Sequence, residues 1–208
     1  MKQRLLGTLL VMWPAFAAAH PHIFIETSLR LVVDDSGQLE AVEVEWVYDD
    51  LYTLLLLEEM GLDGDFDSAL SDDELAKLDG FDLNWVEGYE GDTYVMRGDT
   101  VLPLGDPESL GVELRNGKLV SKHRRAMSGP ADGILVQAYD PTFYTAYDVA
   151  GRVSVSGACT AEIIAADIDR AYAALEELLF ATPQRNVDEQ FPEVGQSFAD
   201  QIWLSCKP

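Results

Sequence analysis

The sequence has few basic residues for its length. Lysine and arginine together number 14, against 37 aspartate and glutamate residues, and the net charge of the 208-residue chain is −23. A surface this acidic repels nucleic acids and anionic membranes, so the composition argues against both kinds of partner. It also attracts cations, although a solubility surface or an adaptation to a salty habitat would produce the same composition.

The chain also lacks a hydrophobic run long enough for a stable membrane span, and residues 51–57 are the best candidate beyond the amino terminus. Lys2 and Arg4 precede a short apolar stretch, and residues 17–19 are alanines, which signal peptidase accepts. This order predicts a cleaved signal peptide over residues 1–19; an uncleaved anchor is the alternative. The leader carries two of the 14 basic residues and none of the 37 acidic ones, so the exported part has a net charge of −25.

Cysteine is scarce: the two are Cys159 and Cys206. In an oxidising compartment an even pair most often forms one disulfide, and we predict that bridge here. It would fix the carboxyl terminus to the body of the domain and, from loop entropy, would contribute roughly 4 kcal/mol to stability. A metal-binding or catalytic thiol is the alternative.

The familiar catalytic motifs are missing. The sequence contains no Gly-x-Ser-x-Gly, no His-Glu-x-x-His and no phosphate-binding loop. Carboxylate pairs are frequent in so acidic a chain and carry little information. Asp140, Tyr144 and Tyr147 could line a pocket, but a strand-end turn with packed aromatic side chains explains them better. We therefore predict that the protein is not an enzyme.

Alternating apolar and polar residues predict an amino-terminal hairpin, with strands at 22–33 and 39–48. Asn116-Gly117 is the best hairpin turn further along the chain. Additional strands are predicted at 82–86, 92–96, 110–115, 118–123, 133–139, 143–147, 152–155 and 201–206.

Leu- and Glu-rich residues 50–60 predict one helix, and residues 72–78 a second, shorter one. Residues 161–180 predict a long carboxyl-terminal helix with Thr160 as its cap. The prediction is therefore one periplasmic α+β domain over residues 20–208, mainly antiparallel sheet, with an EF-hand-like helix-loop-helix insertion.

The loop between the first two helices, residues 63–74, matches the 12-residue EF-hand pattern. The predicted calcium ligands, at positions 1, 3, 5, 9 and 12, are Asp63, Asp65, Asp67, Ser71 and Glu74. Calcium requires hard oxygen ligands at this density. Ser68 replaces the glycine expected at position 6, which costs about 1 kcal/mol for a left-handed backbone. A solvated acidic loop between two helices is the alternative.

Three histidines follow the predicted leader: His20, His22 and His123. Cleavage before His20 would place an α-amine and an imidazole on one residue, with a second imidazole two residues later, and both groups bind copper, nickel and zinc. A polar terminus without a ligand role is the alternative, although a terminus that leads directly into a strand is better ordered than most. His123 could complete the site, despite its place in the basic segment 122–125. We otherwise interpret this segment as a solvated patch that pairs with acidic neighbours, with a docking face as the alternative.

Taken together, these features resemble a family of uncharacterised bacterial periplasmic proteins described as components of ABC-type transport systems. The segments that carry the resemblance are Ala19–Ile25, Val44–Trp46, Leu70–Leu75, Tyr139–Tyr144, Cys159 and Phe198–Cys206. Members are often associated with nickel, cobalt or zinc transport genes, which implies a metal-handling role.

The leading hypothesis is a periplasmic accessory protein that binds a transition-metal ion at His20 and His22, with His123 as a possible third ligand. It would serve a membrane permease or an efflux component. Two alternatives stay open: an interaction module of a transporter complex that binds no transition metal, or a structural protein stabilised by calcium. A copper oxidase with an amino-terminal histidine chelate is a weaker third class.

Overall fold

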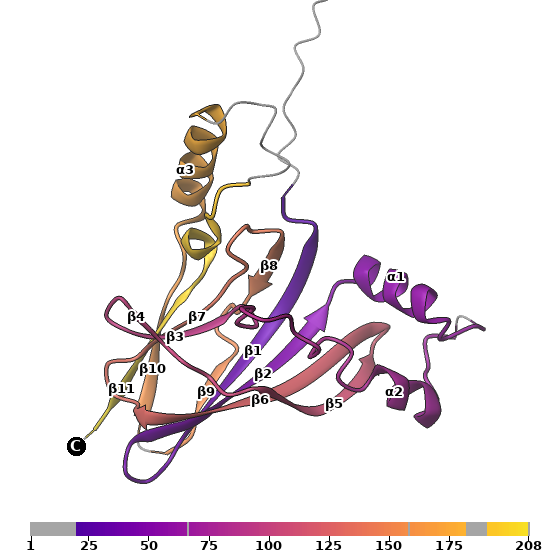
Figure 1. Cartoon of the computed structure of the whole chain (residues 1–208), viewed down its shortest axis with the longest axis horizontal. Coiled ribbons are helices and arrows are strands. Elements are labelled where there is room, and N and C mark those ends of the chain that lie inside the picture. Colours follow the sequence, from indigo (N-terminus) through magenta and orange to yellow (C-terminus); the bar gives the residue numbers. More distant parts are fainter. Residues whose placement is uncertain (1–19, 66, 158, 182–190, 208) are drawn as a thin grey trace, which may run out of the picture.

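The structure is a computed structural model that describes residues 20–65, 67–157, 159–181 and 191–207. The predicted signal peptide, residues 1–19, lies outside the described residues. Two largely antiparallel sheets and three α-helices make up the described part, as Figure 1 shows. The predicted α+β class with mainly antiparallel sheet is confirmed.

The first sheet has the strand order β5-β6-β2-β1-β8, and β9 also pairs with β1. Its strands are β1 (Ile23–Val33), β2 (Gln38–Tyr48), β5 (Pro107–Arg115), β6 (Lys118–Pro130), β8 (Thr145–Asp148) and β9 (Val153–Val155). Strand β1 is antiparallel to β2 along one edge, and along its other edge it is parallel to both β8 and β9. The amino-terminal strand is therefore an inner strand of the sheet.

The second sheet has the order β10-β11-β7-β3-β4. Its strands are β3 (Thr93–Arg97), β4 (Thr100–Leu102), β7 (Leu135–Ala138), β10 (Cys159–Ile164) and β11 (Gln201–Cys206). One hydrophobic cluster contains buried residues of both sheets, among them Leu31 and Val44 from the first and Val136 and Ile202 from the second. The two sheets thus share a single core.

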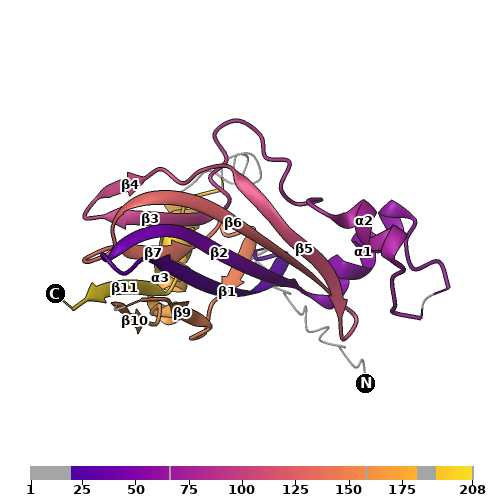
Figure 2. The same cartoon turned by 90° about the horizontal axis from the view of Figure 1, so that it is seen from below.

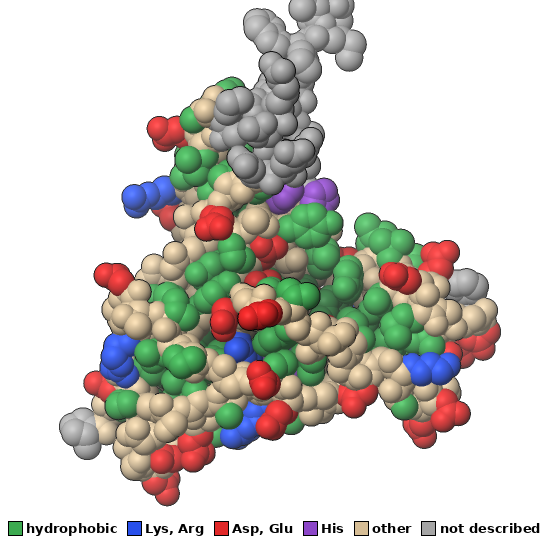
Figure 3. All heavy atoms as spheres, in the orientation of Figure 1, with side chains coloured by type: hydrophobic (Ala, Val, Ile, Leu, Met, Phe, Trp, Pro, Cys, Tyr) green, Lys and Arg blue, Asp and Glu red, His purple; other side chains and the backbone are tan. Residues whose placement is uncertain are grey.

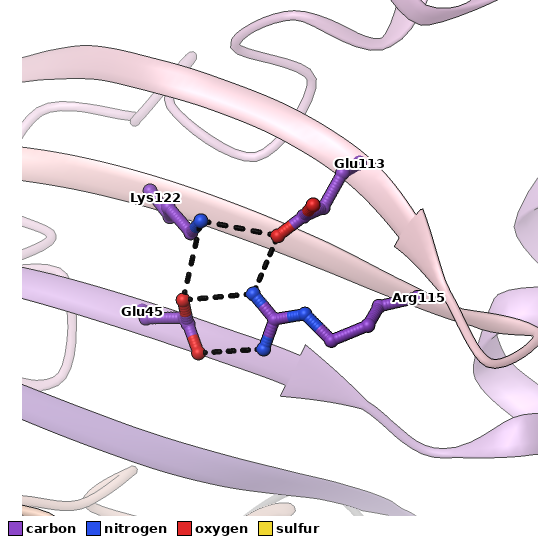
Figure 4. A network of polar contacts seen from close by, with 4 residues as sticks. All are labelled: Glu45, Glu113, Arg115 and Lys122. Atoms are coloured by element: carbon purple, nitrogen blue, oxygen red, sulfur yellow. Dashed lines mark hydrogen bonds and ion pairs between the residues drawn. The ribbon is translucent and has the colours of Figure 1, made fainter.

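Successive side chains along each strand point to opposite faces of the first sheet, so one face is buried and the other is solvent-facing. On β1 the odd-numbered residues from Ile25 onward are buried against the core, and on β2 the even-numbered residues from Val42 onward are buried there. The opposite face carries ion pairs, four partners of which are drawn in Figure 4: Glu45, Glu113, Arg115 and Lys122. Arg115 contacts Glu45 through both terminal nitrogens, at 3.0 and 3.1 Å.

This outward face explains most of the basic segment at 122–125. Lys122 pairs with Glu113 at 3.0 Å, and Arg124 pairs with Glu43 at 3.1 Å. Arg125 points the other way and is buried. The interpretation of this segment as a patch paired with acidic neighbours is confirmed for the two outward residues.

Helices α1 (Asp50–Met60) and α2 (Asp72–Leu78) lie at one end of the long strands, as Figure 2 shows. Asp49 starts α1: its carboxylate accepts hydrogen bonds from the backbone N–H of Tyr52 and of Phe24, both at 2.8 Å. The same side chain therefore caps the helix and holds it to β1. The hydroxyl of Thr53 accepts the backbone N–H of Leu119 on β6 at 3.0 Å, which fixes the helix to the sheet.

Helix α3 (Ile168–Ala181) and the short 3-10 helix η1 (Gly195–Phe198) lie apart from α1 and α2 in Figure 1. They enclose a second, smaller hydrophobic cluster around Phe143, Leu175 and Val194. Gly195 is required at its position because a Cβ there would lie 1.7 Å from the carbonyl oxygen of Asp140. This close approach attaches η1 to the turn that follows β7.

The predicted helix over 161–180 is wrong in its first part. Residues 159–164 form β10, whose β-branched Ile163 and paired register with β11 outweigh the helical pattern. The helix begins after Asp167, whose carboxylate accepts the N–H of Arg170 at 3.1 Å, and it has 14 residues.

One further prediction is wrong, and one strand was not predicted. Residues 82–86, predicted as a strand, contain none: the N–H of Leu83 donates to the carbonyl of Gly80 at 3.0 Å in a turn, and the Trp85 indole donates to the carbonyl of Asp82 at 2.7 Å. Strand β4 has no counterpart in the sequence prediction. The Asn116-Gly117 turn is confirmed, with φ of +53° and +78° between β5 and β6.

The two cysteines lie directly opposite each other on β10 and β11 and form the predicted disulfide. This bond is compatible with a protein outside the cytoplasm. A search of the helices within the described residues finds none that is both long and apolar enough to cross a membrane.

Replacing both Cys159 and Cys206 by serine should lower the free energy of unfolding by roughly 4 kcal/mol, because the unfolded chain regains the entropy of an open loop. Urea unfolding of the double variant would measure this. The wild-type protein with a reducing agent should give the same value. A loss below about 1 kcal/mol in both samples would contradict the prediction.

Candidate functional site

The histidine-rich segment is fixed to the first sheet immediately before β1. The backbone N–H groups of His22 and Ile23 both donate to the carbonyl of Tyr144, at 2.8 and 3.3 Å. The His22 ring also packs on the Tyr144 ring, with centroids 4.7 Å apart. The sheet therefore fixes the backbone of this segment where it leads into β1.

The imidazoles of His20 and His22 lie together. The ring centroids of His20 and His22 are 5.0 Å apart, and the His20 ring stacks on Phe191 at 3.9 Å. An ion bound to an imidazole nitrogen at about 2 Å lies about 3.2 Å from the ring centroid, so two rings on one tetrahedral ion have centroids about 5 Å apart. The observed separation suits a shared ion, and Figure 3 shows histidine side chains at the molecular surface. His22 is exposed, and His20 is partly buried.

His123 is not brought to this pair. It pairs with Val44 on β2, which pairs with Leu29 on β1, and it shares their core-facing side of the sheet. Leu29 lies seven residues along β1 from His22, a distance of about 23 Å at the rise of a strand. His22 is exposed, on the side opposite the core. The structure therefore separates His123 from the other two predicted ligands.

His123 instead lies in an aromatic environment inside the core. It is fully buried, and its ring meets the edges of Trp46 and Trp85 at 4.7 and 5.8 Å. Neither ring nitrogen has a hydrogen-bond partner within the described residues. Burial, helped by the charge of Arg125, lowers the pKa of His123 to about 4, so the ring is neutral at pH 7.

The predicted calcium loop brings three of its five candidate ligands together. Carboxylate oxygens of Asp63, Asp65 and Asp67 lie within 4.8 Å of one another, and Ser68 adopts the left-handed backbone expected at position 6, with φ of +61°. Exposed acidic groups often lie this close without an ion, so calcium binding stays a prediction.

The other two predicted calcium ligands form the capping box of α2. The Ser71 side chain accepts the backbone N–H of Glu74, and the Glu74 carboxylate accepts the backbone N–H of Ser71 at 2.9 Å. The same carboxylate accepts the N–H of Asp63 at 3.2 Å. Glu74 thus closes the loop onto its first residue with the oxygens that a calcium ion would need.

A cleft of about 510 Å³ lies on the other side of β1 from the histidine pair. Its floor includes the buried side chains of Ile25, Trp46 and Tyr48, and exposed residues such as Tyr89 form its rim. Asp140 and Tyr147 also line it, so two of the three residues considered for a pocket from the sequence do lie in one. Figure 3 shows hydrophobic side chains across the middle of the molecule with acidic ones among them.

Asp92 is the most deeply buried carboxylate of the cleft, with 5 % of its surface exposed. The hydroxyls of Tyr89 and Tyr147 donate to it at 2.9 and 2.8 Å. Burial raises the pKa of Asp92 to about 6, although both tyrosine hydrogen bonds act in the opposite direction. Burial also raises the pKa of Tyr147 well above its usual value, so its hydroxyl remains a donor.

Two other cleft carboxylates are also held by neutral donors. Asp82 accepts hydrogen bonds from the hydroxyls of Tyr48, at 2.8 Å, and Ser121. Asp140 accepts from the N–H and hydroxyl of Thr142, at 2.8 and 2.9 Å. Within the described residues neither has a cationic partner within ion-pair distance, and the same holds for Asp92.

The model of the family described as "Protein of unknown function (DUF1007)" matches residues 5–206. The chain belongs to this family. The match spans both halves of the sequence, from within the predicted signal peptide to Cys206, and includes the histidine pair and the cleft. A search among curated proteins finds no significant match.

Sequence reasoning missed most of the cleft. Tyr89 lies in a Gly-rich, acidic stretch with no strand or helix period, and Asp92 is the first residue of the strand predicted at 92–96. Their only local signal is the spacing of an aromatic and an acidic residue three positions apart, which is too common here to select them. The cleft arises when this stretch folds over β1 and β2, and no local pattern predicts such a long-range contact.

His123→Leu should make the protein less sensitive to acid. Because the pKa of His123 is about 4 in the folded protein and about 6.5 in the unfolded chain, the unfolded chain binds more protons between these values. Wild-type stability is therefore lost as the pH falls through this window, by up to about 3 kcal/mol from this residue. Urea unfolding between pH 4 and 7 should show a smaller loss of unfolding free energy in the variant than in the wild type. If the unfolding free energies of the two proteins change in parallel with pH, His123 is not the group responsible.

Asp92→Asn should change the pH dependence of protein stability in the opposite sense to His123→Leu. The pKa of Asp92 is about 6 in the folded protein and near 3.8 when unfolded, so the folded protein binds more protons in between. The stabilisation from a protonated Asp92 is present below pH 3.8 and is lost as the pH rises through 6. The free energy of unfolding of the variant should therefore rise by about 3 kcal/mol relative to that of the wild type between pH 4 and 7. Asp99→Asn, at an exposed turn, is the matched control, and an equal gain there would refute the assignment.

Proposed function

We propose that this protein captures a transition-metal ion outside the cytoplasm at His20 and His22 and serves a membrane transporter of nickel, cobalt or zinc. The observation that carries the proposal is the pairing of two imidazoles on a backbone held by the sheet. A pre-positioned pair loses little conformational entropy on binding, which a frayed terminus would lose in full.

The ligand chemistry favours a borderline transition metal over a hard cation. Imidazole nitrogens bind nickel, copper and zinc, whereas calcium and magnesium select oxygen ligands. Cleavage before His20 would add the α-amine as a third nitrogen, since the residue before Pro21 would then be the first. Pro21 has no amide hydrogen, so it cannot supply the deprotonated backbone nitrogen used by other amino-terminal chelates.

The location and the resemblance agree with this role. The disulfide is compatible with an oxidising compartment, and the predicted leader would direct the chain there. The resemblance to periplasmic components of transport systems favours a transporter as the partner. The ion is cargo in this proposal.

Calorimetry on protein that begins at His20 tests the proposal with nickel, cobalt, zinc and copper. We expect dissociation constants in the micromolar range or below for at least one ion, and at least a tenfold loss in His20→Ala and in His22→Ala. His123→Leu should keep the wild-type affinity, because His123 lies on the other side of the sheet. One extra residue before His20 should weaken binding by moving the α-amine.

Two results would contradict the proposal. Absence of binding for every ion would favour the interaction module, particularly if a permease co-purified with the protein. Binding that survives both histidine substitutions would place the ion elsewhere. A calcium titration in the same series, with Asp65→Asn as the variant, would test the acidic loop separately.

A further inference from the structure

We propose that the cleft between β1, β2 and the segment before β3 binds a small quaternary ammonium ion. This site is separate from the histidine pair, and the inference does not depend on the metal-binding proposal. Its basis is a cleft that combines aromatic walls with carboxylates for which the described residues provide little counter-charge.

The walls are aromatic. Five tyrosines and one tryptophan line the cleft: Tyr48, Tyr52, Tyr89, Tyr94, Tyr147 and Trp46. Aromatic faces attract cations through the ring quadrupole, and clusters of such rings are the usual recognition site for quaternary ammonium groups. The volume of about 510 Å³ lies within the range of small-molecule sites.

The charge of the lining is negative. Its four carboxylates belong to Asp82, Glu90, Asp92 and Asp140, and none of the described lining residues is lysine, arginine or histidine. Arg125 contacts Glu90 at 3.5 Å, while the donors to the other three carboxylates within the described part of the chain are neutral. Ionised carboxylates beside buried rings create a potential that a cation would neutralise.

The arrangement favours an organic cation over a metal ion. A metal site needs several ligand atoms close together. Within the described residues, the group of three possible metal-ligating side chains whose ligand atoms lie within 4.8 Å of one another is Asp63, Asp65 and Asp67, and it lies outside the cleft. The cleft carboxylates are too dispersed to form a comparable ligand set. A methylated ammonium ion suits them better, because its charge is diffuse and it needs no directed ligands.

Choline carries a trimethylammonium group and is small enough for a cleft of about 510 Å³, so it is a suitable probe.

Choline should be titrated into the wild-type protein at pH 8, with calorimetry and tryptophan fluorescence as readouts, beside its neutral isostere 3,3-dimethylbutan-1-ol. We expect choline to bind at least tenfold more tightly than the alcohol. Asp92→Asn should weaken choline binding at least tenfold and leave the alcohol unchanged, because it keeps an acceptor for the tyrosines and removes the charge. Tyr52→Leu, at the partly exposed wall, should weaken choline binding at least fivefold.

Two matched variants separate this site from the rest of the protein. Asp99→Asn removes an exposed carboxylate outside the cleft, and His22→Ala removes a proposed metal ligand; both should bind choline as the wild type does. The inference is overturned if choline does not bind, if the alcohol binds equally well, or if Asp92→Asn and Tyr52→Leu both retain wild-type affinity while folded by circular dichroism.

Discussion

The pairing of β1 along both of its edges is the constraint on which the other features depend. Its antiparallel contact with β2 is local, but its parallel contacts with β8 and β9 join residues 23–31 to residues 145–155. These contacts hold the backbone of His22 against Tyr144. The alternation of side chains along the same strand then directs His22 outward and Ile23 and Ile25 into the cleft. One strand thus positions the histidine pair and the cleft on its two faces.

The sequence predicts the elements whose signals are local. The amino-terminal hairpin, α1, α2 and the Asn116-Gly117 turn each have a period or a turn residue within a few positions, and each lies where it was expected. The helix predicted from residue 161 shows the limit. Alanine-rich residues 161–166 suit a helix when considered alone, but the partner strand β11 and the disulfide make 159–164 a strand. Tertiary pairing outweighs weak helix propensity where an edge strand is available.

The candidate sites also differ in how far they can be predicted from local sequence signals. The histidine pair could be found from the sequence because both ligands lie within three residues and beside a strand. His123 could not be assigned, because its place on the core face depends on the register of β6 with β2, which the sequence alone does not fix. Asp92 and Asp82 could not be found at all, since the tyrosines that hold them come from β2, β8 and the segment before β3. A site assembled from three distant segments has no spacing to detect.

The excess of acidic residues affects the two proposed sites differently. At physiological ionic strength charges are screened over about 8 Å, so a diffuse surface charge acts weakly beyond that range. Near the histidine pair, the Asp49 carboxylate accepts the backbone N–H of Phe24, two residues along β1 from His22, and also caps α1. We expect affinity at the histidine pair to come mainly from nitrogen ligation. In the cleft the carboxylates form part of the wall, where aromatic side chains exclude water and weaken the screening. Coordination would select the ion at the first site, whereas charge and aromatic surface would select it at the second.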